Sequence, residues 1–183
     1  CRFSIPEYKR FYTQAVRNKA VNAIPQMVAR ICGTCSNAHL LCSIKAIEAS
    51  QGIMPSEQTK LLRRLLVNGL MIRDHGLHLY VFVLPDLYNR DSLLVFDENN
   101  PEEHELLHDA FAVKEVGNQL AIWSGGRSVH APTPTIGGFL KLPIQSEQNK
   151  LISQLKSVRT RVIKLITIFQ KCDFSQEEDI SFS

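Results

Sequence analysis

The sequence predicts a mainly α-helical protein, a bundle of long helices with a few short strands and loops. Three segments, 56–84, 102–123 and 146–171, carry apolar residues at helical spacing over many turns. Serine, proline or glycine stands near most of their ends, as is typical of helix boundaries. Only 127–143 is broken by glycine and proline often enough to indicate loop with short strands.

The first third of the chain is expected to contain two helices. Segment 7–19 has aromatic and apolar residues at helical spacing, and 24–31 is a short apolar segment that leads to Cys32. Segment 37–50 is apolar on nearly every side, which predicts a helix buried on most of its faces. Gly52 follows it, at the position where glycine commonly ends a helix.

The long helix over 56–84 is expected to begin at Ser56, since a serine hydroxyl can accept a hydrogen bond from a free backbone N–H of the first turn. Pro85 is expected to stop this helix, because proline lacks the backbone donor that an α-helix needs.

The two later helices also have residues that are typical of helix starts and ends. Pro101 stands at the first position of 102–123, and Gly125–Gly126 closes it, although Gly117 weakens the helical pattern inside it. Ser146 is expected to cap the last helix. Its apolar stripe consists of Leu151, Leu155, Val158, Val162, Leu165, Ile166 and Phe169.

Composition favours a globular protein and gives no sign of a nucleic-acid-binding or membrane-spanning one. The 183 residues are 44% hydrophobic and 21% charged, which fits one globular domain over 1–183. A net charge of +3 gives no case for a nucleic-acid or anionic-membrane partner, and no apolar run is long enough for a membrane span. Five cysteines, an odd number, fit a reducing compartment better than a disulfide framework. We therefore expect a cytoplasmic location and a chain cut at both ends.

Cys32 and Cys35 form the most informative motif. Two thiols three positions apart can direct both sulfurs at one soft metal ion, and His39 follows four positions later. A helix that begins beside Cys35 would favour its thiolate. We expect the two sulfurs to face a cleft between helices that is flanked by the long helices over 56–84 and 146–171. The residues alone leave three alternatives open: a redox dithiol, a zinc site that includes Cys42, and inert cysteines. In the last case we expect Cys42 to be a small, buried apolar side chain.

Two histidine pairs on helices need weighing. His75 and His78 can share one helix face, but no carboxylate stands at a matching offset, so packing is the better interpretation. His104 and His108 flank Glu105 in the HExxH pattern of zinc proteases. No third ligand is evident, and this enzyme is the weaker alternative.

The wider pattern resembles the N-terminal part of the [NiFe]-hydrogenase large subunit. The resemblance runs through Arg30–His39, then Arg73–Tyr80 and Leu84–Leu87, then Gly125–His130 and Gly137–Gly138. Three ordered motifs are much more specific than one.

The resemblance implies a part of the hydrogenase large-subunit fold and covers nearly the whole chain. The tail 139–182 is similar to that family's proline, long helix and short strand. The motifs are most similar to the cytoplasmic branches that pass electrons to viologens, heterodisulfides, deazaflavins or nicotinamide. The sequence departs at Ser36 and Ala131, where those relatives often carry proline, which affects turn rigidity and not ligand chemistry.

The resemblance also implies roles at a nickel–iron centre, where iron carries diatomic ligands and H2 is cleaved heterolytically and reversibly. Cys32 would be a terminal thiolate on nickel, and Cys35 would bridge the two metals. His39 would donate toward the bridging sulfur and orient it. Gly33 would allow the tight turn, and Arg30 would anchor the loop.

Further expectations concern partners. Arg127 and His130 would lie near an iron–sulfur cluster of the small subunit. The second thiolate pair of the family is absent, so the chain would be an incomplete N-terminal half, inactive alone. Two alternatives stand: a non-catalytic scaffold related to the quinone-reductase subunit of complex I, which lacks the cysteines, and a zinc-binding module.

Overall fold

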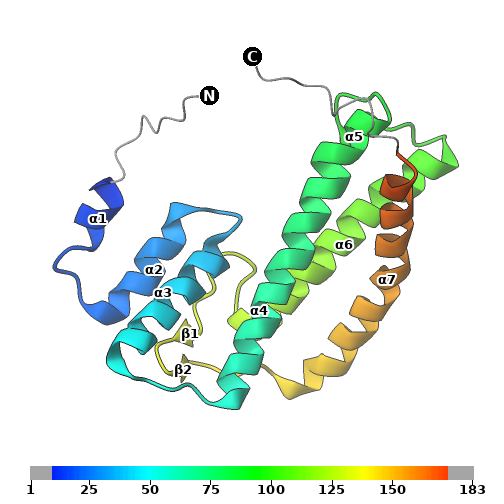
Figure 1. Ribbon diagram of the computed structural model, residues 1–183. Coiled ribbons are helices and arrows are strands. Elements are labelled where there is room, and N and C mark those ends of the chain that lie inside the picture. The colour runs from blue at the N-terminus through cyan, green and yellow to red at the C-terminus, as the bar shows by residue number, and fades with distance from the viewer. Residues whose placement is uncertain (1–9, 173–183) are drawn as a thin grey trace.

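Helices form nearly all of the regular structure, as predicted. The computed structural model describes residues 10–172 (Figure 1). The helices and strands are, in order, α1 Arg10–Val16, η1 Val21–Ala23, α2 Ile24–Val28, η2 Ala29–Ile31, α3 Ser36–Gln51, α4 Glu57–Gly76, η3 Leu77–Val83, α5 Leu84–Leu87, η4 Leu93–Val95, α6 Pro101–Gly125, β1 Pro134–Thr135, β2 Gly138–Phe139, η5 Gln145–Glu147 and α7 Gln148–Gln170. The first residues of the helix expected over 7–19 and the tail strand lie outside the described part.

The predicted caps are confirmed for three of the long helices. Ser56 Oγ accepts from the backbone N–H of Thr59 at 3.2 Å at the start of α4. Pro101 is the first residue of α6, as predicted, and Asn100 before it accepts hydrogen bonds from the backbone N–H groups of Glu102 and Glu103. Gly52 ends α3 with φ +66°, a left-handed conformation that favours glycine.

The prediction that Ser146 caps the last helix is wrong. Ser146 lies inside the short helix η5, and α7 begins after Glu147 without a side-chain cap. The apolar stripe of α7 is nevertheless correct in its main members, since Leu151, Val158 and Leu165 are buried.

Pro85 does not stop the long helix, contrary to expectation. The segment η3 is π-helical, and the Leu84 N–H at its end reaches the carbonyl of Leu79, five residues back. This wider turn leaves room for the proline ring, and the helix continues as α5 to Leu87. Residues 57–87 therefore form one long helical rod.

The helices α4 and α6 pack unusually closely, because each presents a glycine to the other. A Cβ atom at Gly69 would lie 2.7 Å from the backbone nitrogen of Ala121, and one at Gly117 would lie 2.5 Å from that of Arg73. Gly117, which weakened the helical pattern in the sequence, is thus explained by helix packing.

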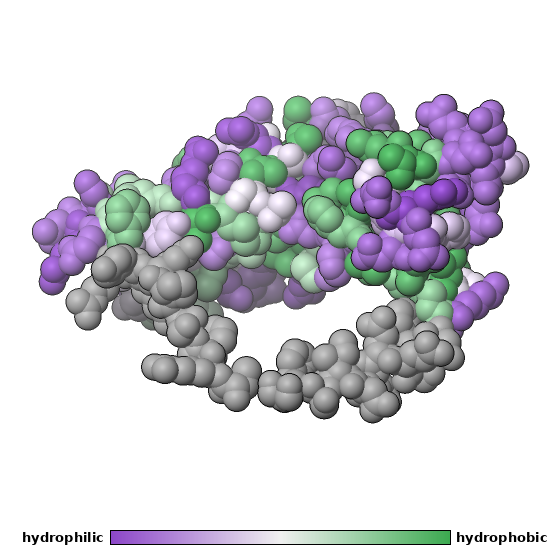
Figure 2. All heavy atoms as spheres, turned by 90° about the horizontal axis from the view of Figure 1, so that it is seen from above, coloured by the Kyte–Doolittle hydropathy of each residue, from purple (hydrophilic) through white to green (hydrophobic). Residues whose placement is uncertain are grey.

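Two apolar cores lie along this pair of helices. One is where α6, α7 and the π-helical segment meet, and includes Tyr80, Leu106 and Val158. The other joins α3 to the opposite ends of α4 and α6, through Leu40, Ile44, Leu66 and Ala121 among others. On the face seen in Figure 2, apolar side chains also stand exposed among polar ones.

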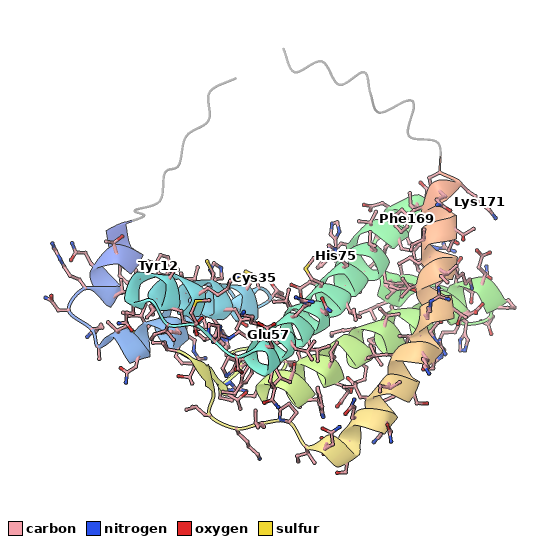
Figure 3. All side chains as sticks on the ribbon, turned by 60° about the horizontal axis from the view of Figure 1, so that its bottom comes forward. Tyr12, Cys35, Glu57, His75, Phe169 and Lys171 are labelled. Atoms are coloured by element: carbon pink, nitrogen blue, oxygen red, sulfur yellow. A yellow bond between two sulfur atoms is a disulfide. The ribbon has the colours of Figure 1, made fainter. Side chains whose placement is uncertain are left out.

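The expected position of the last helix is also wrong. We expected α7 to flank the cysteine motif together with α4. Instead α7 packs against α6, and Phe169 and Cys35 lie on opposite arms of the molecule (Figure 3). The cause is its apolar stripe, which fits the core around Tyr80.

Candidate metal centre

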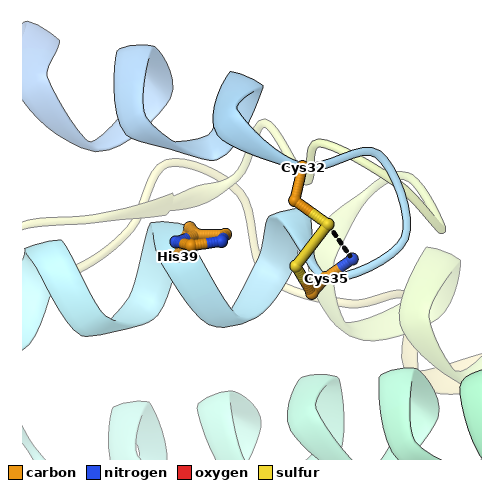
Figure 4. A group of neighbouring side chains, drawn as sticks. All are labelled: Cys32, Cys35 and His39. Carbon is orange, nitrogen blue, oxygen red and sulfur yellow. Dashed lines mark hydrogen bonds between the residues drawn. A yellow bond between two sulfur atoms is a disulfide. The ribbon is translucent and has the colours of Figure 1, made fainter. Parts of the chain in front are cut away.

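The two motif cysteines meet at the start of α3. Cys32 is extended and follows η2, and Cys35 is the residue at the N-cap of α3. Their Cα atoms are 5.5 Å apart, and the sulfurs are in direct contact as a disulfide (Figure 4). The backbone N–H of Cys35 also donates to Cys32 Sγ, at 3.2 Å. The turn therefore directs both sulfurs to one point.

His39 joins this pair one helical turn later. One donor atom from each of Cys32, Cys35 and His39 lies within 4.8 Å of the other two, and all three side chains are half-buried. Within residues 10–172 no other group of three or more histidine, cysteine or acidic side chains comes this close.

Cys42 does not belong to the group. Its side chain is exposed on α3, so the prediction of a small buried apolar side chain is wrong. The zinc site of four ligands proposed from the sequence therefore retains three of them.

The face of α3 that carries Cys42 borders a groove of about 810 Å³ between α3 and α4. Its lining is mainly apolar and consists of Ala38, Leu41, Cys42, Lys45, Glu48, Ala49, Ile53, Met54, Pro55, Lys60, Arg63, Arg64 and Val67. Cys32, Cys35 and His39 are outside this lining, so the cysteine pair does not face this groove. Because Ala38, Ala46 and Ala49 are exposed, α3 is also less buried than its composition predicted.

A buried ion pair fixes α3 against α4 beneath this groove. Both terminal nitrogens of the Arg63 guanidinium donate to the Glu48 carboxylate, at 2.6 and 2.8 Å, and the backbone N–H of Gly137 donates to it at 2.7 Å. The hydrogen bonds from Arg63 hold the pKa of Glu48 below its ordinary value.

Arg73, and not Arg30, anchors the cysteine loop. Arg30 is exposed. Arg73 is 5% exposed on α4 and donates to the carbonyl oxygen of Thr34, within the loop, and to that of Ser128 at 2.6 Å. Sequence reasoning missed this role. The sequence did contain one sign of this role. Arg73 follows Leu66 by seven positions, two helical turns, so it lies on the buried side of α4, where a charged side chain needs hydrogen-bond partners.

The loop that carries Arg127 and His130 is bonded to the same end of α3. Asn37 donates to the Ser128 carbonyl at 2.9 Å and accepts from the Ala131 N–H at 3.1 Å. The His130 N–H donates to Ser36 Oγ at 2.9 Å. The Arg127 side chain is exposed, whereas Nδ1 of His130 is buried and has no hydrogen-bond partner within residues 10–172.

Gly33 does not need to be glycine for the turn itself. A Cβ atom there would have no neighbour within 4 Å among the described residues, and φ is not in the left-handed region. The expectation that a glycine is needed for the sulfurs to converge is therefore wrong for this loop.

The other histidines do not form a site of this kind. His75 and His78 are both exposed, and therefore they are not packed as expected. The rings of His104 and His108 are 4.5 Å apart on exposed turns of α6, while Glu105 pairs with Lys164. No third ligand is close to this pair within the described chain, so the geometry does not support the zinc-protease alternative.

The fold and the site define a class of protein: a helical scaffold in which two cysteines and a histidine, residue types that suit a thiophilic metal, lie close together. The family model described as nickel-dependent hydrogenase matches residues 12–115, more than half of the chain. The chain belongs to this family.

Similar sequences support this family membership. The chain is 32% identical to the alpha subunit of sulfhydrogenase 2 of Pyrococcus furiosus over 168 residues, 92% of this chain and 40% of that protein. It is 32% identical to a chain of the F420-non-reducing hydrogenase vhu of Methanocaldococcus jannaschii over 151 residues, 78% of this chain and 35% of that one. The chain thus spans about two fifths of the length of these relatives.

The fold is also similar to that of an NAD+-reducing [NiFe]-hydrogenase, with a TM-score of 0.76 and 22% identity over 90% of this chain and 38% of that one. A [NiFeSe]-hydrogenase of Dm. baculatum gives a TM-score of 0.66 with 21% identity, over 87% of this chain and 37% of that one. Within residues 10–172 no helix is long and apolar enough to cross a membrane.

Proposed function

We propose that this chain is the N-terminal portion of the catalytic large subunit of a [NiFe]-hydrogenase, which oxidises H2 reversibly. The observation that carries the proposal is the convergence of the Cys32 and Cys35 sulfurs at the start of α3. Membership of the nickel-dependent hydrogenase family supports it.

The donor set fits one half of such a centre. Thiolates suit nickel and iron, and Cys32 and Cys35 would hold nickel at a terminal and a bridging position. His39, one turn along α3, would orient the bridging sulfur and set its basicity. When bound, the nickel–iron pair with its diatomic ligands supplies the site at which H2 is split heterolytically.

The second pair of thiolates would come from polypeptide outside residues 10–172, because Cys42 is not in the group of Cys32, Cys35 and His39, and Cys172 follows α7 on the other arm. We therefore regard 1–183 as a single incomplete domain that needs the remaining part of the large subunit. The small subunit with its iron–sulfur clusters would approach the loop of Arg127 and His130. We also propose a cytoplasmic location, because a reducing compartment would keep Cys32 and Cys35 as thiols.

The test is H2-dependent dye reduction by the completed large subunit with its small subunit. We expect activity in the wild type and its loss in Cys35→Ser, because a hydroxyl is a poor bridging ligand for two soft metals. The control is Cys42→Ala, which should retain activity since Cys42 is exposed and apart from the pair. The isolated chain should neither hold a stable nickel–iron centre nor oxidise H2. Activity that survives Cys35→Ser would show that the assignment is wrong.

A further inference from the structure

Two imidazole rings lie side by side on the exposed side of α6, outside the group of Cys32, Cys35 and His39. His104 and His108 are four residues apart, so both side chains project from the same face of the helix. Both residues are exposed, and the centres of their rings are 4.5 Å apart. The pair is therefore open to solvent and close enough for both rings to bind one ion.

The rest of the helix fixes the backbone that carries this pair. Asn100 caps α6 just before the first histidine, by accepting hydrogen bonds from two backbone N–H groups. On the opposite side, Leu106 and Ala110 are buried in the core between α6 and α7. The spacing of the two histidines is thus set before an ion arrives, which lowers the entropic cost of binding.

The distance between the rings indicates the geometry of the ion. A metal–nitrogen bond of about 2.0–2.1 Å places the centre of an imidazole ring about 3.2 Å from the metal. Two rings at neighbouring positions of an octahedral or square-planar ion then have centres about 4.5 Å apart, whereas two rings on a tetrahedral ion are about 5.2 Å apart. The observed 4.5 Å agrees with the first arrangement.

The donor atoms narrow the class of ion further. Imidazole nitrogen suits nickel, copper and zinc, whereas calcium and magnesium prefer oxygen ligands. Octahedral and square-planar nitrogen sites are typical of nickel(II) and copper(II), and tetrahedral sites are typical of zinc. Within residues 10–172 no further histidine, cysteine or acidic side chain joins the pair, so water would fill the remaining positions.

The charges around the pair do not exclude a cation. Two basic side chains of α7 approach this part of α6, and each is paired with a carboxylate: Arg161 with Asp109, and Lys164 with Glu105. The carboxylate of the exposed Glu102 forms no ion pair within the described chain. Its negative charge offsets the positive end of the helix dipole.

We infer that His104 and His108 bind one nickel(II) or copper(II) ion as a two-imidazole chelate on the surface of α6. The inference goes beyond the proposed function, because the site needs neither the cysteine pair nor the remaining part of the large subunit. It also gives the HExxH string a use other than proteolysis. The two histidines bind the ion, and Glu105 stays paired with Lys164.

The experiment titrates the 183-residue chain with nickel(II) ions alone and follows binding by calorimetry. Every protein carries Cys32→Ser and Cys35→Ser, so that the cysteine motif contributes no thiolate. X-ray absorption at the nickel edge reports the coordination number and the imidazole ligands. The matched control is His75→Ala with His78→Ala, because these two histidines are also exposed on one helical rod but are three residues apart, the second in the π-helical segment.

We expect one nickel ion per chain, six-coordinate, with two imidazoles and no sulfur. His104→Ala and His108→Ala should each lower the nickel affinity at least about tenfold, because losing a ligand should cost no less than losing an outer-shell partner of a ligand. Alanine favours the helix at both exposed positions, so circular dichroism should not change. The control pair should bind nickel as the background does, and zinc should bind more weakly than nickel.

Two results would overturn the inference. If either His104→Ala or His108→Ala binds nickel as tightly as the background, the two rings do not act as a pair. If the bound nickel has fewer than two imidazoles, or if zinc binds more tightly than nickel, the geometry inferred from the ring spacing is wrong. Both results leave the proposed function unaffected, since that function rests on Cys32 and Cys35.

Discussion

Arg73→Gln should loosen the attachment of the cysteine loop to the helical bundle. The Arg73 guanidinium is 5% exposed and donates to the carbonyl oxygens of Thr34 and Ser128 and to the Asp74 carboxylate. A glutamine side chain is shorter and uncharged, so it cannot maintain these three bonds.

The size of the effect follows from what each partner retains. Asp74 can turn to water because it is 29% exposed, and the Ser128 carbonyl keeps its bond from Asn37. The Thr34 carbonyl loses a charged donor, a bond worth about 1.5–3 kcal/mol. With part of the Ser128 contribution, we expect the free energy of unfolding to fall by about 2–4 kcal/mol.

Urea unfolding followed by circular dichroism measures this change, and the exposed Arg64→Gln on the same helix is the control, with an effect within about 0.5 kcal/mol. Because Arg73 and Asn37 share the Ser128 carbonyl, Arg73→Gln and Asn37→Ala should couple by about 0.5–2 kcal/mol in a double-mutant cycle. If Arg73→Gln is no more destabilising than Arg64→Gln, these bonds do not hold the loop.

Two further predictions concern the packing of the scaffold. Glu48→Gln leaves the Arg63 guanidinium buried without its counter-charge and should lower the free energy of unfolding by about 3–5 kcal/mol at pH 7. Because the pKa of Glu48 is lowered from 4.5, the stability that its carboxylate contributes is present above that value and is lost as pH falls through the folded-state pKa. Urea unfolding at pH 7 and in acid should therefore show a smaller difference in stability between wild type and Glu48→Gln in acid. A difference that does not change with pH would refute the role of the Glu48–Arg63 ion pair. Gly117→Ala should destabilise by about 1–3 kcal/mol in thermal unfolding, because its Cβ would meet the Arg73 backbone, whereas Gly33→Ala should stay within about 0.5 kcal/mol; equal effects would contradict the close packing of α4 and α6.

The sequence was sufficient for the elements whose stability is local. Apolar spacing and caps predicted α4, α6 and the length of α7, because those signals depend on neighbours three or four residues apart. The sequence was insufficient where contacts between distant residues determine the local structure or the packing of a helix. The π-helical turn before Pro85 and the packing of α7 on α6 both depend on the core around Tyr80, which joins residues about eighty positions apart.

At the cysteine site, too, local spacing could be predicted from the sequence and distant contacts could not. Cys32, Cys35 and His39 could be found from spacing, since a short turn and one helical turn bring them together. Arg73 could not be placed, because its partners lie 39 and 55 positions away and are backbone carbonyls that no residue type reveals. The exposure of Cys42 was missed for a related reason: an apolar neighbourhood in sequence does not show which side of α3 has a helix packed on it.

The two departures from the family pattern belong together in the structure. Ser36 and Ala131 stand where the resemblance to the family leads us to expect proline, and they lie on two segments that are hydrogen-bonded to each other. The Ser36 hydroxyl accepts from the His130 N–H, and the Ala131 N–H donates to Asn37. Proline at either position would remove one of these bonds, because it has neither a hydroxyl nor a backbone N–H. Two hydrogen bonds between residues 94 positions apart therefore join the start of α3 to the loop of His130. These two positions thus affect how the start of α3 is held and leave Cys32, Cys35 and His39 unchanged.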